Sequence, residues 1–212
     1  MVIVEDQELM SISLVEVLRM ESLAASAILP EDAEALLTEL ENVQPDVVLL
    51  DLDLGLLGDG LEFVAPIARS GAKVLILTGS HDELRHAACL EAGAWGIITK
   101  DVDLDSLLAA IRRAASGEPS SAADERQRLL AELRRWRSYQ DRRLAPFRSM
   151  TAREAEILDA MRHGMSVAVM SEELDIAPTT ARSHIRSVLV KLGTTSQLEA
   201  VALAREVGWI GQ

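Results

Sequence analysis

The sequence predicts an α/β doubly wound (βα)5 domain followed by a smaller all-α domain of four helices. In the first half, short apolar runs alternate with segments whose apolar residues recur at helical spacing. Strands that alternate with helices form a parallel sheet. After residue 118 no further strand pattern occurs. The chain has 212 residues, enough for two small domains, and its 49% hydrophobic content excludes a disordered protein.

The first domain is expected to span residues 1–117. Its first helix illustrates the pattern, because Leu9, Ile12, Val15 and Leu18 recur every three residues. We expect five strands at residues 2–5, 23–28, 46–51, 73–78 and 95–98, and helices at 7–20, 31–43, 60–70, 82–92 and 103–116.

Residues 118–149 are expected to form a linker helix. The pattern before it is broken by Gly117, Glu118, Pro119, Ser120 and Ser121. The helix is rich in arginine and carries a short apolar stripe of Leu129, Leu133 and Trp136. The stripe is too short for a sustained coiled coil, so we expect it to pack on a neighbouring domain, with a dimer contact as the alternative. Pro146 is expected to end the helix.

Residues 150–212 are expected to contain four helices. Thr151 and Glu154 have the spacing of a capping box at the start of the first, which Gly164 ends. The second begins at Ser166 and ends near Leu174. Pro178 opens the third, which runs to Leu192, and the fourth begins at Ser196. A short helix, a tight turn and a longer polar helix are typical of a helix-turn-helix.

The net charge of −13 is concentrated in the first domain. Residues 1–117 carry 7 basic and 21 acidic side chains, whereas residues 118–150 carry 8 and 5, and residues 151–212 carry 6 and 8. A DNA-binding protein must neutralise phosphates with lysine and arginine. In the second half of the chain the numbers of basic and acidic side chains are nearly equal, and the basic residues are clustered. DNA binding by this half is therefore compatible with the negative net charge of the whole chain.

Cys89 is the single cysteine, which excludes a disulfide within the chain and a cysteine metal site. It lies in an apolar helical stretch, so we expect a packing role. No apolar run approaches the roughly 20 residues that cross a bilayer. The first residues, MVIVEDQ, lack the basic region of a secretory signal, so we expect no membrane partner and a cytoplasmic location.

Five polar side chains fall at the carboxyl ends of the expected strands, where open parallel sheets bind ligands. They are Glu5, Asp6, Asp51, Thr78 and Lys100. Carboxylates brought close together repel one another unless a cation offsets them, and hard oxygen ligands suit Mg²⁺. The alternative is that each strand end simply carries a cap or a solvated charge. The occurrence of all five side chains at strand ends favours a binding site for a divalent cation.

With Mg²⁺ bridging, an ionised aspartate can attack an incoming phosphoryl group. Asp51 is the expected nucleophile. After transfer, the Thr78 hydroxyl would donate to one phosphoryl oxygen and the Lys100 ammonium would pair with another. Such a site acts as a switch rather than as an enzyme that turns over.

The third helix of the second domain has two different faces. Ile185, Val188, Leu189 and Leu192 form an apolar face, and the opposite side is polar and basic. There we expect guanine or phosphate contacts from Arg182 and Arg186, close approach at Ser183, and phosphate contacts from Thr179, Thr180 and Lys191. The alternative is a solvated helix face.

Four segments of the first domain, VIVEDQ, DVVLLDLDLGLLGDGLE, VLILTGS and EAGAWGIITKD, resemble the receiver domain of two-component response regulators of the NarL/FixJ branch. The resemblance covers essentially all of residues 1–117. It implies that Asp51 accepts phosphate from a sensor histidine kinase. It also implies that Glu5, Asp6 and Asp51 hold Mg²⁺ together with the backbone carbonyl of Asp53.

The segment MTAREAEILDAMRHGMSVAVMSEELDIAPTTARSHIRSVLVKLGTTSQLEAVALA resembles the LuxR-type DNA-binding domain. The resemblance implies that Arg182, Ser183 and Arg186 lie at the main DNA-contacting positions. His184 matches a recurrent histidine that contacts the DNA backbone or packs internally. The second helix carries VAVMS in place of a more polar pattern, which predicts fewer phosphate contacts and a DNA affinity that depends on dimerisation.

Three positions of the first domain depart from the family pattern. Gly55 stands where a proline is usual, which predicts a looser loop. Ile97 stands where the family often has a switching aromatic, so phosphorylation would have to be reported otherwise, for example through Thr78 and the helix that follows it. Asp53 adds a carboxylate near the phosphoryl site.

Together these features predict a DNA-binding response regulator that controls transcription. Phosphorylation of Asp51 would shift a two-state receiver, reposition the recognition helix and favour a homodimer on promoter DNA, with RNA polymerase as a further candidate partner. One alternative is a regulator of the same fold that works without phosphorylation, through a ligand or as a constitutive dimer. A remote alternative is a phosphatase of the haloacid dehalogenase type, which the LLDLDLG segment superficially resembles, although that family needs its nucleophile on the first strand.

Overall fold

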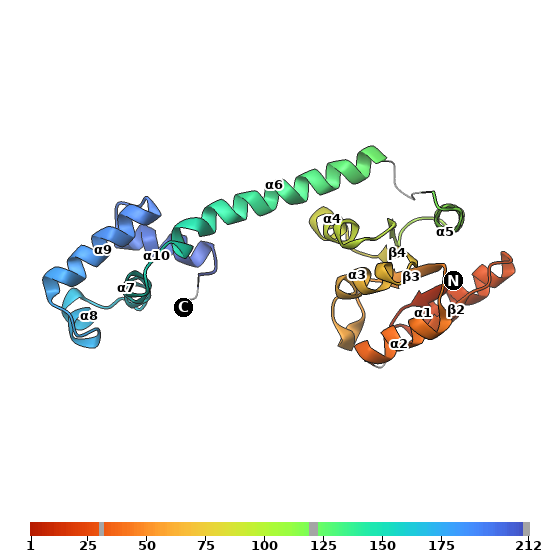
Figure 1. The fold of residues 1–212 in the computed structure, drawn as a ribbon, viewed down its shortest axis with the longest axis horizontal. Helices are drawn as coiled ribbons and strands as arrows, with labels where there is room; N and C mark the ends of the chain where they lie inside the picture. The colour runs from red at the N-terminus through yellow and green to blue at the C-terminus, as the bar shows by residue number, and fades with distance from the viewer. Residues whose placement is uncertain (30–31, 119–122, 210–212) are drawn as a thin grey trace. The chain divides into compact units, whose positions relative to one another are not determined.

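The computed structural model describes residues 1–29, 32–118 and 123–209 (Figure 1). It divides into two compact units, Met1–Arg134 and Arg135–Gln212. Among the described residues, no helix is both long and apolar enough to cross a membrane.

The first unit is built on a five-stranded parallel sheet in the order β2-β1-β3-β4-β5. The strands are β1 (Val2–Val4), β2 (Ser26–Ile28), β3 (Val47–Asp51), β4 (Lys73–Thr78) and β5 (Gly96–Thr99). The helices are α1 (Glu8–Met20), α2 (Ala33–Val43), α3 (Leu61–Arg69), α4 (Glu83–Ala92) and α5 (Leu104–Ser116), with a 3-10 turn, η1 (Gly55–Leu57). The predicted doubly wound (βα)5 fold is confirmed.

The sheet has a hydrophobic core on each face. One core packs side chains of α1 and α5 against alternate strand residues such as Ile3, Leu49 and Leu75. The other packs side chains of α2, α3 and α4 against residues such as Val4 and Leu50. Because successive strand residues point to opposite faces, strands buried on both sides are continuously apolar, as the sequence is here.

Strand β2 is shorter than the 23–28 predicted from its apolar residues. The chain leaves α1 through Ser22 at φ 61°, and the Leu23 N–H donates to the Leu18 carbonyl at 2.9 Å. This bond ties Leu23 to the end of the helix, so pairing with β1 starts only at Ser26.

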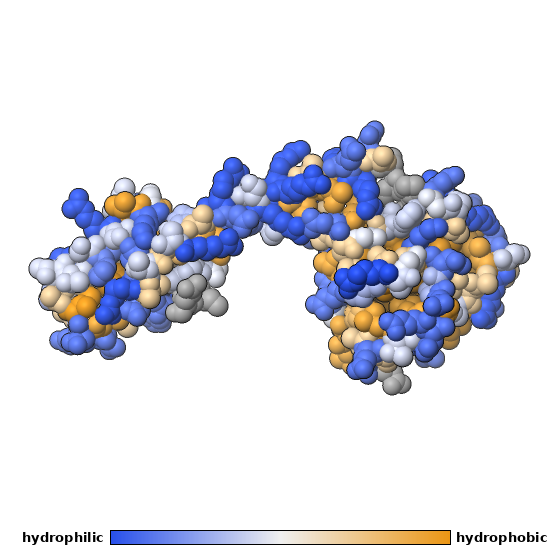
Figure 2. All heavy atoms as spheres, in the orientation of Figure 1, coloured by the Kyte–Doolittle hydropathy of each residue, from blue (hydrophilic) through white to orange (hydrophobic). Residues whose placement is uncertain are grey.

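Helix α6 (Ala123–Arg148) begins in the first unit and continues into the second. Leu129 and Leu133 are buried in the core that contains α4, while Trp136, the third residue of the predicted stripe, is 45% exposed. The face drawn in Figure 2 shows mainly hydrophilic side chains along α6. The prediction that Pro146 ends the helix is wrong, because α6 extends two residues beyond it. Of the residues predicted to break the chain before α6, 119–121 lie outside the described part.

The second unit contains α7 (Ala152–Arg162), α8 (Val167–Glu173), α9 (Pro178–Leu192) and α10 (Gln197–Glu206). The predicted capping box of Thr151 and Glu154 is present, Ser166 and Ser196 cap α8 and α10, and Pro178 occupies the first turn of α9. The core lies between these helices and includes Phe147, Ile157, Met170 and Val188. The predicted all-helical second domain is confirmed.

Candidate functional site

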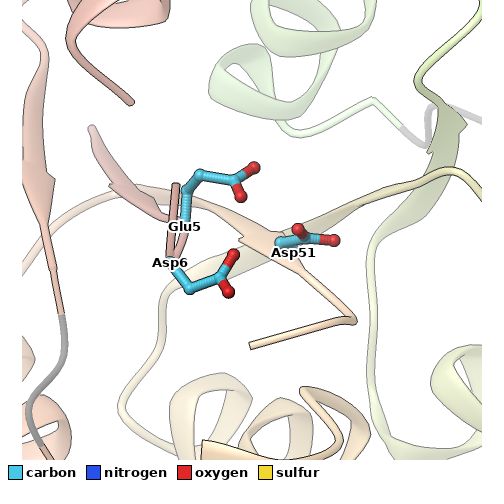
Figure 3. Close-up of side chains that lie close together, drawn as sticks. All are labelled: Glu5, Asp6 and Asp51. Atoms are coloured by element: carbon cyan, nitrogen blue, oxygen red, sulfur yellow. The ribbon is translucent and has the colours of Figure 1, made fainter. Parts of the chain in front are cut away.

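Three carboxylates meet at the carboxyl edge of the sheet (Figure 3). Glu5 and Asp6 follow β1, and Asp51 is the last residue of β3, which pairs directly with β1. One oxygen from each can be chosen so that all lie within 4.8 Å of one another. Glu5 and Asp51 are only 1% and 3% exposed, whereas Asp6 is exposed.

Lys100 supplies the positive charge for this cluster. Its ammonium donates to Asp51 Oδ2 at 2.7 Å and to Glu5 Oε2 at 3.0 Å. The residue directly follows β5, and its backbone N–H donates to the Thr78 carbonyl at 2.8 Å, which extends the pairing of β4 with β5 by one step. The structure therefore brings together Glu5, Asp6, Asp51 and Lys100 from three strand ends.

The electrostatics of the cluster favour a further cation. Burial raises the pKa of Glu5 to about 6, and the neighbouring Asp51 charge adds to this, although the Lys100 hydrogen bond opposes it. Burial lowers the pKa of Lys100, but the hydrogen bonds that its ammonium donates to Asp51 and Glu5 outweigh this and raise the pKa. A single ammonium faces three carboxylates, and their oxygens are the hard ligands that Mg²⁺ prefers. These residues thus fit a magnesium ion.

Thr78 ends β4 on the other side of Asp51. The strand register pairs Asp51 with Leu77, so Thr78 lies one residue further along the neighbouring strand. It is fully buried, and its hydroxyl oxygen accepts from the Ser80 N–H at 3.0 Å. This bond leaves the hydroxyl hydrogen available to donate.

The loop after β3 is held by Arg85, a residue that the sequence analysis missed. Asp53 and Asp59 pair across this loop as an isolated antiparallel bridge. Arg85, on α4, donates to both of their carboxylates and to the Leu52 carbonyl, each at 3.0 Å. The sequence offers only one sign of this contact, a basic side chain in the first turns of the helix that follows β4. No residue near it in the sequence indicates that this side chain reaches the loop after β3.

The looser loop predicted for Gly55 stays a prediction, but the backbone at this position explains why a glycine stands here. Its φ is +56°, which proline cannot adopt, and a Cβ at this position would lie 2.6 Å from Asp6 Oδ2. The turn is closed by a hydrogen bond from the Gly58 N–H to the Gly55 carbonyl and by another from the Gly60 N–H to the Leu52 carbonyl. The glycine therefore admits the Asp6 carboxylate into the site.

Ile97 is half-buried on β5 and lines a pocket of about 330 Å³ with His86, Leu129 and seven other residues. His86 is itself buried, and its Nε2 lies 2.8 Å from the Ser80 carbonyl oxygen, at the loop that follows Thr78. The aliphatic Ile97 side chain has no polar group with which to form a hydrogen bond to the residues around Asp51.

The outer face of α9 carries most of the predicted DNA-contacting residues. Thr179, Thr180, Arg182, Ser183 and Arg186 are exposed, and His184 is half-buried. The opposite face is buried through Ala181, Ile185, Val188 and Leu192. This division gives α9 a free basic and polar surface.

Lys191 occupies a different environment from the other predicted phosphate contacts. Its ammonium donates to Glu154 Oε2 at 2.6 Å and to the Ser149 carbonyl at 2.9 Å. Ser187, on the preceding turn of α9, also donates to the Glu154 carboxylate. The hydrogen bonds of Lys191 and Ser187 to Glu154 tie α9 to the start of α7. The sequence did not indicate this role for Glu154 and Ser187.

Glu154 is buried but charged. Burial raises its pKa, but hydrogen bonds from Lys191, Ser187 and Thr151 outweigh this and hold the pKa at about 2. The carboxylate is therefore ionised across the physiological range and fixes α9 electrostatically.

Family models match both units. Residues 1–112 match the response regulator receiver domain, and residues 148–204 match the bacterial regulatory proteins of the luxR family. The chain is 32% identical over 164 residues to the transcriptional regulatory protein LiaR of Bacillus subtilis, which covers 76% of this chain and 75% of that protein. It is 35% identical over 161 residues to the nitrate/nitrite response regulator protein NarP of Escherichia coli, covering 74% and 72% of the two chains.

The match to the transcriptional regulatory protein DegU of Brevibacillus brevis is 27% identical and spans 99% of this chain and 94% of that protein. A solved structure of the Salmonella typhimurium RcsB response regulator shares the fold, with a TM-score of 0.51 and 22% identity over 96% of each chain. The chain belongs to the response regulators that combine a receiver domain with a LuxR-type helix-turn-helix domain.

Proposed function

We propose that this protein is a DNA-binding transcription regulator switched by phosphorylation of Asp51, with a sensor histidine kinase as the phosphoryl donor. The observation that carries the proposal is the position of the Asp51 carboxylate, which is nearly buried between Lys100 and the acidic residues that follow β1. The proposed domains are the receiver at 1–117, the linker helix at 118–149 and the DNA-binding domain at 150–212.

Phosphoryl transfer at this site would proceed by attack of an Asp51 carboxylate oxygen on phosphorus while the bond from phosphorus to the donor's imidazole nitrogen breaks. Bound Mg²⁺, held by Glu5, Asp6, Asp51 and the Asp53 carbonyl, would neutralise the phosphoryl oxygens. Lys100 already contacts Asp51 Oδ2, so its ammonium needs little movement to reach an oxygen of the acyl phosphate. The hydroxyl group of Thr78 would donate a hydrogen bond to another oxygen of the acyl phosphate.

The DNA would be read by the exposed face of α9. Arg182 and Arg186 can donate to guanine edges or to phosphates, Thr179 and Thr180 suit phosphates at the start of the helix, and Ser183 permits close approach. Half-buried His184 would contact the backbone or pack. Lys191 would support α9 through Glu154 in addition to any phosphate contact.

In its active form the protein would bind promoter DNA as a homodimer that spans two half-sites, with RNA polymerase as a further partner. This activity is regulatory and has no turnover chemistry. The phosphatase alternative is disfavoured because Asp51 lies on the third strand of the chain rather than the first. Promoter binding would place the protein in the cytoplasm.

The test is treatment of the full chain with Mg²⁺ and beryllofluoride, followed by light scattering and by titration with promoter DNA. We expect a magnesium-dependent shift to dimer and tighter DNA binding in the wild type, and neither in Asp51→Asn. Glu41→Gln, which removes an exposed carboxylate on α2, is the matched control and should respond as the wild type does. A wild type that is already dimeric and does not respond would favour the phosphorylation-independent regulator.

A further inference from the structure

Arg85 connects helix α4 to the loop that follows the phosphoacceptor strand. One guanidinium nitrogen, Nη2, lies 3.0 Å from the Leu52 carbonyl oxygen, from Asp53 Oδ1 and from Asp59 Oδ1. The Arg85 side chain is 23% exposed, so these charge-assisted bonds are partly shielded from water. The cation thereby joins α4 to both arms of the loop.

The bonded residues are those that control the geometry next to Asp51. Leu52 is its neighbour in the chain, and the Asp53 N–H donates to Asp51 Oδ1 at 3.2 Å. The Leu52 carbonyl also accepts from the Gly60 N–H at 2.8 Å, which closes the loop. A shift of the Asp51–Asp53 backbone therefore displaces the Leu52 and Asp53 acceptors of Arg85 directly, and it reaches Asp59 through the bridge between Asp53 and Asp59.

On its other side, α4 is fixed to the first half of α6. Arg128 forms two hydrogen bonds to the Glu83 carboxylate, at 2.8 and 3.0 Å, near the start of α4. Arg126 donates to the Leu90 and Ala94 carbonyls, each at 2.9 Å, at the end of α4. Leu129 and Leu133 are buried in the same core, so polar and apolar contacts both tie the first half of α6 to α4.

We infer that Arg85 is a positioning residue that couples the phosphoacceptor loop to α4 and, through α4, to the first half of α6. This inference rests on the proposed function. A phosphoryl group adds up to about two negative charges beside a loop that already carries the Asp53 and Asp59 carboxylates. The loop responds, and Arg85 carries the response into α4. The coupling passes by a charged contact, whereas the aliphatic Ile97 offers no hydrogen bond for this purpose.

The experiment is hydrogen exchange of the full chain, with and without Mg²⁺ and beryllofluoride, in wild type, Arg85→Met and Arg85→Lys. Methionine keeps the aliphatic stem but removes the charge and the donors. Arg112→Met is the matched control, because Arg112, on α5, forms an exposed ion pair at 2.9 Å with Glu21, the residue that follows α1. Exchange is compared in the loop at 52–60, in α4 at 83–92 and in the α6 segment 123–134.

In the wild type and in Arg112→Met, beryllofluoride should change exchange in all three segments. In Arg85→Met the loop should still respond, which shows that the ligand binds, while the response of α4 and α6 is lost. Arg85→Lys, which keeps the charge with a single donor group, should recover part of it. A response of α4 and α6 in Arg85→Met as large as in the wild type would overturn the inference.

Failure of the proposed function has a different signature, namely no beryllofluoride response in the wild-type loop. In that case, the hydrogen-exchange rates measured without beryllofluoride test the role of Arg85. Loss of the Arg85 bonds should speed exchange in both the loop and α4 by about tenfold, because hydrogen bonds to charged groups are among the stronger ones. Unchanged rates in α4 would count against any coupling through Arg85.

Discussion

The Lys100 ammonium lies 2.7 Å from Asp51 Oδ2, and 49 positions separate the two residues in the chain. The same ammonium holds Glu5, so one cation satisfies two nearly buried carboxylates from different strands. Among the described residues, Lys100 is therefore the main compensation for the charge of Asp51 and Glu5.

We predict that Lys100→Met destabilises the metal-free receiver by about 3 kcal/mol, because removing one partner of a buried ion pair leaves uncompensated charge. Added Mg²⁺ should restore much of this loss, since it offsets the same carboxylates. Chemical denaturation at several Mg²⁺ concentrations measures both effects. Lys73→Met, which removes only a lysine stacked 5.5 Å from the Trp95 ring centre, should show no comparable rescue.

Gly55→Ala and Gly58→Ala form a matched pair. Both glycines have positive φ, so alanine at either should cost stability through backbone strain, about 1 kcal/mol or more at Gly55 and more at Gly58, where ψ is −135°. Only at Gly55 would the new Cβ meet Asp6 Oδ2, whereas the space beside Gly58 is open. We therefore expect weaker Mg²⁺ binding in Gly55→Ala alone, as measured by calorimetric titration. Equal Mg²⁺ affinities in the two variants would show that the close approach of residue 55 to Asp6 does not affect Mg²⁺ binding.

The second domain should lose stability in acid through Glu154. The pKa of this carboxyl is about 2 in the folded protein and has the ordinary glutamate value of 4.5 when unfolded, so its contribution is complete above pH 4.5 and is lost as the pH falls towards 2. The full contribution is about 3 kcal/mol. It can be followed by the fluorescence of Trp209, which packs near Phe147, in a chain carrying Trp95→Phe and Trp136→Phe.

The control for this titration is Glu154→Gln in the same background. It should be less stable than the parent at pH 7 and should show a flatter decline over the same pH interval, because the titrating group is absent. A parallel decline in both proteins would mean that other carboxyls cause the loss.

On α9, we predict that Arg182→Ala and Arg186→Ala each weaken binding to promoter DNA by about tenfold or more without lowering stability, since both side chains are exposed. Arg153→Ala, which removes a half-buried arginine of α7 that pairs with Glu156, is the control and should bind as the wild type does. Binding isotherms at several salt concentrations provide the measurement.

Lys191→Met should behave differently from the two arginine variants. Its main expected effect is loss of stability in the second domain, because Glu154 loses its principal partner. If this variant keeps full stability and lowers the salt dependence of DNA binding by about one ion, Lys191 acts on phosphate alone.

Local patterns in the sequence determined the fold of this protein. The alternation of apolar strands with amphipathic helices specifies the parallel sheet, and the Thr151 capping box and Pro178 mark two helix starts within a residue. The edge of a parallel sheet gathers strand ends, so Glu5, Asp6, Asp51 and Lys100 could be assigned to one site from topology alone. Each of these features depends on residues close in sequence or on a general rule of chain geometry.

Only the tertiary structure decided which side chains satisfy one another. The bonds of Arg85 to Asp59 and of Lys191 to Glu154 join residues 26 and 37 positions apart. The approach of Gly55 to Asp6 likewise leaves no periodic trace, and the stripe that contains Leu129 indicated packing without identifying α4 as its partner. A charged side chain on a helix reads the same in the sequence whether it faces water or a partner, because the choice depends on the packing of distant elements.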